Sequence, residues 1–140
     1  MRKRLLSATA AFALLSGWGG LAHAQKIEEV RVGPPGVAGR LDWTDPKLES
    51  DNSSYELWRF AAVGGKTYEI RMSSSDFDAY LALGSDVMAE PLAQDDDGGG
   101  GTDARIRWRA PSDGVFQIRA NSVSAGEEGA YLLTIDEAAP

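Results

Sequence analysis

The sequence predicts an all-β protein, a jelly-roll-like antiparallel β-sandwich of about eight short strands. From Tyr55 onward, apolar and polar residues alternate along several short runs, and strict alternation indicates strands with one buried face. Clusters of glycine, proline, serine and aspartate separate these runs, as turns do. No window of helical length shows apolar residues at a period of 3.6. Several short alternating runs separated by turn residues are typical of a sandwich.

Six strands are predicted after residue 54, each with an inward face. The first places Trp58, Phe60 and Ala62 inward and Arg59 outward. The inward residues of the other five are Tyr68, Ile70 and Met72; Ala79, Leu81 and Leu83; Ile106, Trp108 and Ala110; Phe116, Ile118 and Ala120; and Tyr131, Leu133 and Ile135. Two earlier strands are predicted near Ile27 to Val32 and Arg40 to Trp43, and we expect Gly33 to Gly36 to loosen the first from the core.

Arginines occupy the outward positions of one predicted strand, at Arg105, Arg107 and Arg109. Such a row could bind an anion. In so acidic a chain, however, a solvated face paired across strands with acids such as Glu56 and Glu69 is favoured.

Three tryptophans follow the N-terminal region. Trp58 and Trp108 share the phase of the inward residues, which favours core packing over a platform that stacks against sugars. Trp43 belongs to a weaker strand and is the aromatic residue most free for another role.

The N-terminal residues have the pattern of an export signal. Basic residues 2–4 precede the apolar run Leu5 to Leu15, and Ala22-His23-Ala24 has the form of a cleavage site. The apolar run is shorter than the roughly 20 residues that a membrane-spanning helix needs. We therefore predict a cleaved signal peptide over residues 1–24, a mature chain that begins at Gln25, and export to the periplasm or the medium, without membrane insertion after cleavage.

Composition restricts the partners and the chemistry. Residues 1–24 contain three of the 14 basic residues and none of the 21 acids, so residues 25–140 carry 11 basic residues, 21 acids and a formal net charge of −10. This charge argues against nucleic acid or an anionic membrane surface as a partner. Cysteine is absent, and the one histidine, His23, lies in the predicted signal peptide. Without imidazole or thiol groups the common hydrolytic sites cannot form, and we predict that the protein is not an enzyme.

An acidic loop follows residue 94. Asp95, Asp96 and Asp97 precede four glycines, and Asp103 comes soon after. An EF-hand that began at Asp95 would need an acid or amide at its fifth position and glutamate at its twelfth, where this chain has glycine and isoleucine. The nonapeptide of calcium-binding β-helices is matched once, but it functions only as stacked repeats. Neither motif fits.

A series of short motifs resembles a known family. In chain order the motifs are Trp58-Arg59-Phe60, Phe77-Asp78-Ala79-Tyr80-Leu81-Ala82-Leu83, Asp95-Asp96-Asp97-Gly98, Asp103-Ala104-Arg105-Ile106, Pro111 to Gly114, and Gly129-Ala130-Tyr131-Leu132-Leu133. Together they resemble the bacterial pre-peptidase C-terminal domain. These domains are secreted β-sandwich modules, usually appended to peptidases and related to the collagen-binding modules of clostridial collagenases.

The resemblance covers residues 38–136 and implies a division of the chain. Residues 1–24 are then the signal peptide, 25–37 an N-terminal segment, 38–136 the sandwich domain and 137–140 a tail. No peptidase precedes the matching region, so we expect a free-standing copy of the module.

The resemblance also implies that Asp78 faces the cluster of Asp95, Asp96 and Asp97. Carboxylates brought together repel one another unless a cation or hydrogen-bond donors compensate, so two interpretations stay open. In one, these four residues and Asp103 bind a metal ion, which would be calcium because the loop offers only hard oxygen ligands. In the other, the loop is a corner in which glycine amides donate to Asp103 or Asp78.

The collagen-binding relatives take calcium mainly through acids of the N-terminal segment and ahead of the first matching strand. Glu28, Glu29 and Asp51 are loose counterparts of those acids, but Ser54 stands where a second acid would be. This departure argues against calcium binding by the N-terminal segment.

Residue types and resemblance together predict a non-catalytic exported binding or accessory module that recognises a protein, a glycan or cell-envelope material. The alternative is a regulatory or chaperone-like partner of a separately encoded secreted peptidase. An enzyme with paired carboxylates, as in glycosidases, would need Asp78 and Asp96 to flank a deep cleft, which a sandwich of this size does not usually have.

Overall fold

The computed structural model describes residues 26–140. The predicted signal peptide and Gln25 lie outside the described residues. The predicted fold class is confirmed, because residues 26–140 form nine strands in two mainly antiparallel sheets, against the predicted number of about eight. Within the same residues, no helix is long and apolar enough to span a membrane.

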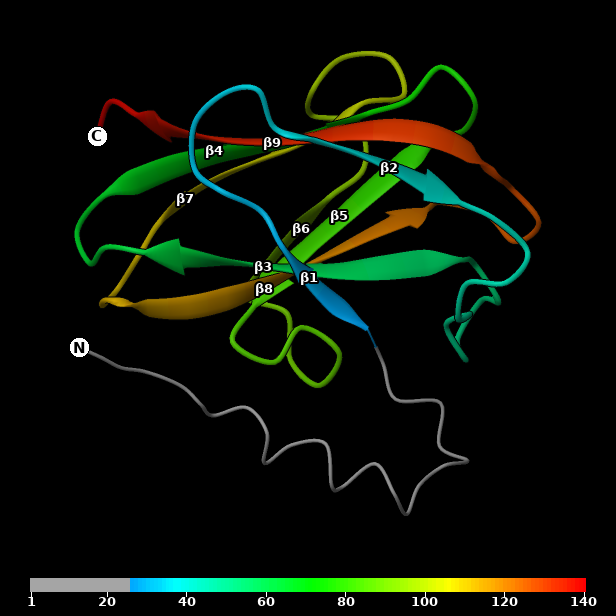
Figure 1. Ribbon diagram of the computed structural model, residues 1–140, viewed down its shortest axis with the longest axis horizontal. Coiled ribbons are helices and arrows are strands. Elements are labelled where there is room, and N and C mark those ends of the chain that lie inside the picture. Colours follow the sequence, from blue (N-terminus) through cyan, green and yellow to red (C-terminus); the bar gives the residue numbers. More distant parts are fainter. Residues whose placement is uncertain (1–25) are drawn as a thin grey trace, which may run out of the picture.

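The two sheets face each other as the layers of a sandwich (Figure 1). The first sheet has the order β1-β3-β8-β5-β6, and its strands are Ile27–Glu29 (β1), Tyr55–Ala62 (β3), Gly114–Ser122 (β8), Ala79–Gly84 (β5) and Ala93–Asp95 (β6). The second has the order β2-β9-β4-β7, and its strands are Val37–Leu41 (β2), Gly129–Ala138 (β9), Thr67–Ser73 (β4) and Ala104–Arg109 (β7). Every pair is antiparallel except β1 and β3, which run parallel.

The core lies between the sheets and consists of the residues that alternation predicted. All the predicted inward residues of the six later strands are buried except Trp108, which is partly buried and packs against the core. The ring of Trp108 meets the ring of Phe116 edge-on, at 4.7 Å between centroids. Core packing is therefore confirmed for both Trp58 and Trp108, while Trp43 is 78% exposed.

The N-terminal strands differ from the prediction in their bounds and attachment. β2 covers Val37–Leu41 and ends before Trp43, because the amide of Asp42 turns to donate to the Asp45 carboxylate. The segment from Gly33 to Gly36 does not loosen the chain. The Gly33 amide donates to the Ile135 carbonyl at 2.7 Å, so residues 27–41 cross from the edge of the first sheet to the edge of the second.

A chain of hydrogen bonds joins the sheets through the core. The Trp58 indole Nε1 donates to the Tyr131 hydroxyl at 2.8 Å, and that hydroxyl donates to Glu56 Oε1 at 2.5 Å. Glu56 therefore does not pair with the arginine row, contrary to the prediction. It lies two residues before Trp58 and so has the same inward phase. Burial raises the pKa of the Glu56 carboxyl, and burial together with the bond to Glu56 raises the pKa of Tyr131.

Loops cover part of the outer face of the first sheet. Tyr55, Leu57, Ala82 and Val87 form a second buried cluster there, with Leu48 packed against it. Residues that alternation would place in solvent on this face are consequently buried.

Candidate functional site

The acidic loop joins an edge strand of each sheet. β6 was not predicted, because it is only three residues long and has no alternating run; it pairs with residues 81–83 of β5. The loop then leads into β7, at the edge of the other sheet. Asp95 Oδ2 accepts hydrogen bonds from the amides of Gly98 and Arg105, at 2.7 and 2.8 Å. Arg105 belongs to an edge strand, so Asp95 provides an acceptor for an amide at the open edge of the sheet.

The glycines form the turn that returns the chain to β7. The Gly99 amide donates to the Asp103 carbonyl, and the Asp103 amide donates to the Gly100 carbonyl, both at 3.0 Å. Gly100 and Gly101 have φ angles of 100° and 61°, in the region that glycine adopts without strain. The geometry of the turn therefore favours glycine at these two positions.

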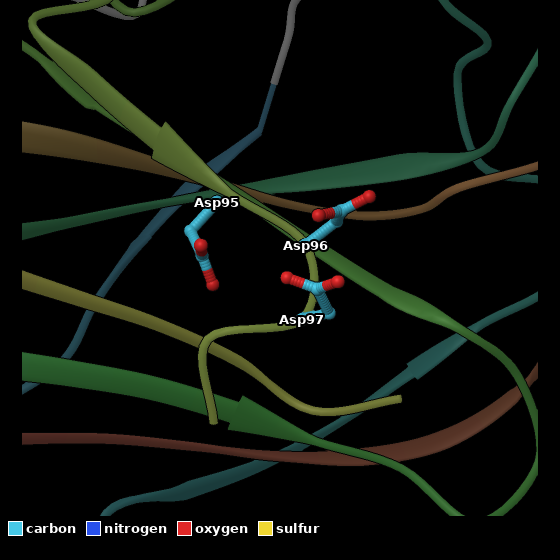
Figure 2. Close-up of side chains that lie close together, drawn as sticks. All are labelled: Asp95, Asp96 and Asp97. Atoms are coloured by element: carbon cyan, nitrogen blue, oxygen red, sulfur yellow. The ribbon is translucent and has the colours of Figure 1, made fainter. Parts of the chain in front are cut away.

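Three of the five predicted ligands come together. Asp95, Asp96 and Asp97 each offer a carboxylate oxygen within 4.8 Å of the others. Figure 2 shows that the side chains of Asp95 and Asp96 leave the backbone in opposite directions. This group does not include Asp78 or Asp103.

The other two predicted ligands have contacts of their own. Asp78 is half-buried, and its carbonyl accepts a hydrogen bond from the Val123 amide at 2.9 Å. Asp103 Oδ1 accepts a weaker bond from the Ser74 amide at 3.4 Å. The resemblance implied that loop amides donate to Asp103 or Asp78. In the structure they donate instead to the side chain of Asp95 and to the backbone carbonyl of Asp103.

The outer face of the second sheet carries exposed arginines from three strands. We call Arg40 of β2, Arg71 of β4, and Arg105, Arg107 and Arg109 of β7 the arginine face; all five are exposed. The prediction of a solvated face is confirmed, and so is the role of Glu69. Glu69 Oε2 lies 2.7 Å from Arg71 Nε, and Glu69 Oε1 lies 4.0 Å from Arg105 Nη1.

Positive charge is in excess on this face. The outward positions of the same strands include two acids, Glu69 and Asp136, whereas the whole sequence has 21 acids and 14 basic residues. Arg71 and Arg105 lie directly opposite each other in the β4–β7 register. Like charges in opposite positions destabilise a sheet, and Glu69, which pairs with both arginines, offsets only one of the two positive charges.

Arg119 is a candidate functional residue that the sequence did not indicate. Alternation directs it outward from β8, yet it is 8% exposed, because the second cluster and its loops cover that face. Burial lowers the pKa of its guanidinium. Nothing in the local pattern distinguishes Arg119 from Arg105, since the loops that cover it are remote in the chain.

Comparison with known proteins identifies the fold. Neither protein-family models nor curated proteins match the sequence. Among solved structures, the pre-peptidase C-terminal domain of a collagenase from Bacillus anthracis matches with a TM-score of 0.58 and 13% identity, over 79% of this chain and 95% of that one. A periplasmic inhibitor of g-type lysozyme from Aeromonas hydrophila matches with a TM-score of 0.45 and 17% identity, over 80% of this chain and 99% of that one. The chain therefore has the fold of the pre-peptidase C-terminal domain, and the resemblance indicated by its motifs is confirmed as a likeness of fold.

Proposed function

We propose that the protein is a non-catalytic exported binding or accessory module that contacts an acidic protein through the arginine face. The observation that carries the proposal is the uncovered outer face of the second sheet, where five arginines are exposed in a chain with an excess of acids. The fold shared with an accessory domain of a collagenase is compatible with this role.

The geometry of the arginine face suits a broad partner. Alternate residues of one strand are about 6.6 Å apart and neighbouring strands about 4.8 Å apart, so the guanidinium groups are spread over a flat surface. Arginine binds carboxylates in a bidentate geometry that lysine cannot reproduce. The negative charge of the remaining surface would repel nucleic acid and anionic membranes. An acidic patch on another exported protein is a suitable partner.

A capture experiment with matched variants tests the proposal. Residues 25–140 serve as bait in periplasmic extract and culture medium, beside Arg105→Glu/Arg109→Glu and the control Lys26→Glu/Arg31→Glu. We expect wild type and control to retain one acidic protein that the first double variant loses. Raised salt should release this protein, because exposed charge pairs are screened.

Equal retention by both double variants would refute the role of the arginine face. Predominant capture of a peptidase would favour the alternative, a regulatory or chaperone-like partner of a secreted peptidase. Capture of glycan or cell-envelope material through the arginine face, in place of a protein, would contradict the proposed class of partner.

We also propose calcium as a stabilising ion at the acidic loop. Asp95, Asp96 and Asp97 provide hard oxygen ligands within 4.8 Å of one another, which suits calcium better than softer metals. One oxygen of Asp95 already accepts two amides, so the ion would rely on the remaining carboxylate oxygens. An exposed site of this kind should be weak, about millimolar to submillimolar, as in other extracellular modules.

A further inference from the structure

A pocket of about 330 Å³ lies on the outer face of the first sheet, beside the acidic loop. Its volume is at the lower end of the range for small-molecule sites. The pocket is formed by the loop before β3, the β5–β6 hairpin and the end of β8. Its lining includes Asp51, Tyr80, Gln94, Asp96, Arg119 and Asn121.

Arg119 provides a buried charge at this pocket. Its Nε donates to Asn121 Oδ1 at 3.1 Å, and its guanidinium carbon lies 5.8 Å from the centre of the Tyr80 ring. Within residues 26–140 Arg119 forms no ion pair, and its two Nη groups have no hydrogen-bond partner. The residue is nine-tenths buried, but its Nη groups reach the pocket, since the buried side-chain atoms without a partner in residues 26–140 include none of Arg119. Because Arg119 lines the pocket, its Nη groups are donors available to a ligand.

A network of buried hydrogen bonds fixes the position of Arg119. Asn121 Nδ2 donates to Ser53 Oγ at 3.2 Å and to the Ser122 carbonyl at 2.7 Å. Ser53 Oγ in turn donates to Asp51 Oδ1 at 2.6 Å. Asn121 and Ser53 are 2% and 0% exposed. The network holds Arg119 in place before any ligand arrives, and such preorganisation favours binding.

The walls of the pocket provide both hydrogen-bond donors and hydrogen-bond acceptors. The Tyr80 hydroxyl donates to Gln94 Oε1 at 2.7 Å, which leaves the Gln94 amide nitrogen as a donor. Asp96 and the second oxygen of Asp51 are acceptors. A guanidinium, a carboxamide and two carboxylates therefore line the pocket together with the Tyr80 ring.

We propose that this pocket binds a neutral polyhydroxylated ligand, a sugar residue of a glycan. Each sugar hydroxyl can donate and accept a hydrogen bond, and planar groups with two polar atoms match adjacent hydroxyls. An anion would pair with Arg119 but would also lie beside Asp51 and Asp96, and a cation would meet the guanidinium. The pocket lies on the first sheet and the arginine face on the second, so each proposal can fail without the other.

Titration of residues 25–140 with neutral sugars tests the proposal. Glucose, galactose, N-acetylglucosamine and their disaccharides are the probes, with sodium acetate as the anionic comparison, and NMR chemical shifts report binding. We expect at least one sugar to bind with a dissociation constant on the order of 1 mM, since a small ligand gains little free energy per atom. The shifts should include Tyr80, Gln94 and Arg119 and persist at raised salt, which screens charge pairs.

Paired variants locate the binding. Asp96→Asn and Glu90→Gln each remove one negative charge from exposed positions in this region, but only Asp96 lines the pocket. We expect Asp96→Asn and Gln94→Ala to weaken sugar binding about tenfold, as loss of a hydrogen bond to a charged or buried group does, and Glu90→Gln to leave it unchanged. Absence of sugar binding, binding of acetate in its place, or equal effects of Asp96→Asn and Glu90→Gln would overturn the proposal.

Discussion

The hydroxyl of Tyr131 has two roles in the core, because it accepts from the Trp58 indole and donates to Glu56. Each partner comes from β3, whereas Tyr131 belongs to β9 of the opposite sheet. A buried polar group that loses its partner retains the full cost of having been removed from water. The stability of the sandwich therefore depends on this single oxygen more than on an average core atom.

Replacing Tyr131 by phenylalanine should destabilise the protein by about 1–3 kcal/mol, because the Trp58 and Glu56 groups are left unpaired. Chemical denaturation measures the change in the free energy of unfolding. Tyr68→Phe is the matched control, since the Tyr68 hydroxyl accepts from the amide of Val63, an exposed residue. A smaller loss in Tyr131→Phe than in the control would contradict the role given to the cross-sheet chain.

The Glu56 carboxyl predicts a specific pH dependence. Its pKa is raised above the ordinary value of 4.5, first by burial, so folding disfavours the ionised form. The contribution of this carboxyl to folding stability is complete at pH values below its ordinary pKa. It is lost as the pH rises through the higher pKa of the folded state. Glu56→Gln keeps an acceptor for Tyr131 and cannot ionise.

We therefore expect wild type to lose stability relative to Glu56→Gln as pH increases over an interval that begins near 4.5 and extends upward. Urea denaturation of both proteins at a series of pH values measures the difference. A constant difference over that interval would show that the Glu56 carboxyl is not perturbed by folding.

At the scale of elements, the acidic loop closes one side of the sandwich. Asp95, at the end of β6, accepts the amide of Gly98 in the loop and the amide of Arg105 in β7. Residues 27–41 connect the sheets through β1 and β2. Edge strands with unpaired amides can associate with other chains, and these connections reduce that exposure.

Asp95→Ala should cost about 1–3 kcal/mol of unfolding free energy, since two amides lose an acceptor that carries charge. Asp97→Ala, a neighbouring substitution at an exposed position, should stay within about 0.5 kcal/mol. Thermal and urea denaturation of the two variants make the comparison. Equal losses of unfolding free energy in the two variants would indicate that stability depends on the negative charge of the loop and not on the hydrogen bonds of Asp95.

Calcium binding at the loop should appear as thermal stabilisation. At about 100 times its dissociation constant, calcium would add roughly 2.7 kcal/mol, which raises the melting temperature of a domain of this size by several degrees. The test compares calcium, magnesium and a chelator on wild type and on Asp96→Asn. A flat response leaves the loop as a hydrogen-bonded corner. A response that persists in Asp96→Asn but disappears in Glu28→Gln or Asp51→Asn places the ion in the N-terminal segment.

The alternation of apolar and polar residues predicted the strands that have one buried and one exposed face. It missed the features that depend on contacts with residues far away in the chain. Trp58 and Ile118 alternate with polar neighbours, so their inward direction could be read locally. β6 is short and has no alternation, and it exists because β5 offers it a partner. Arg119 is buried by loops far away in the chain. The acidic loop could be recognised, but the selection of Asp95 as the acceptor of two amides depends on where β7 begins.

At the scale of the whole molecule, export is our proposal and has a direct test. The basic start, the apolar run and Ala22-His23-Ala24 predict cleavage after residue 24. Intact mass spectrometry of protein purified from the periplasm or the medium should find a chain that begins at Gln25. Retention of residues 1–24 in the purified protein would refute the predicted processing.

The order of strands in the sheets also determines when the sandwich can assemble. β8 lies between β3 and β5, and β9 lies between β2 and β4, so the last two strands in the chain hold both sheets together. A polypeptide that emerges with its N-terminus first, from a ribosome or a membrane channel, has no partner for β2 until β9 appears, and β3 must wait for β8 to complete its pairing. Such long-range pairing makes folding slow. The incomplete chain therefore cannot complete either sheet before its last two strands have emerged.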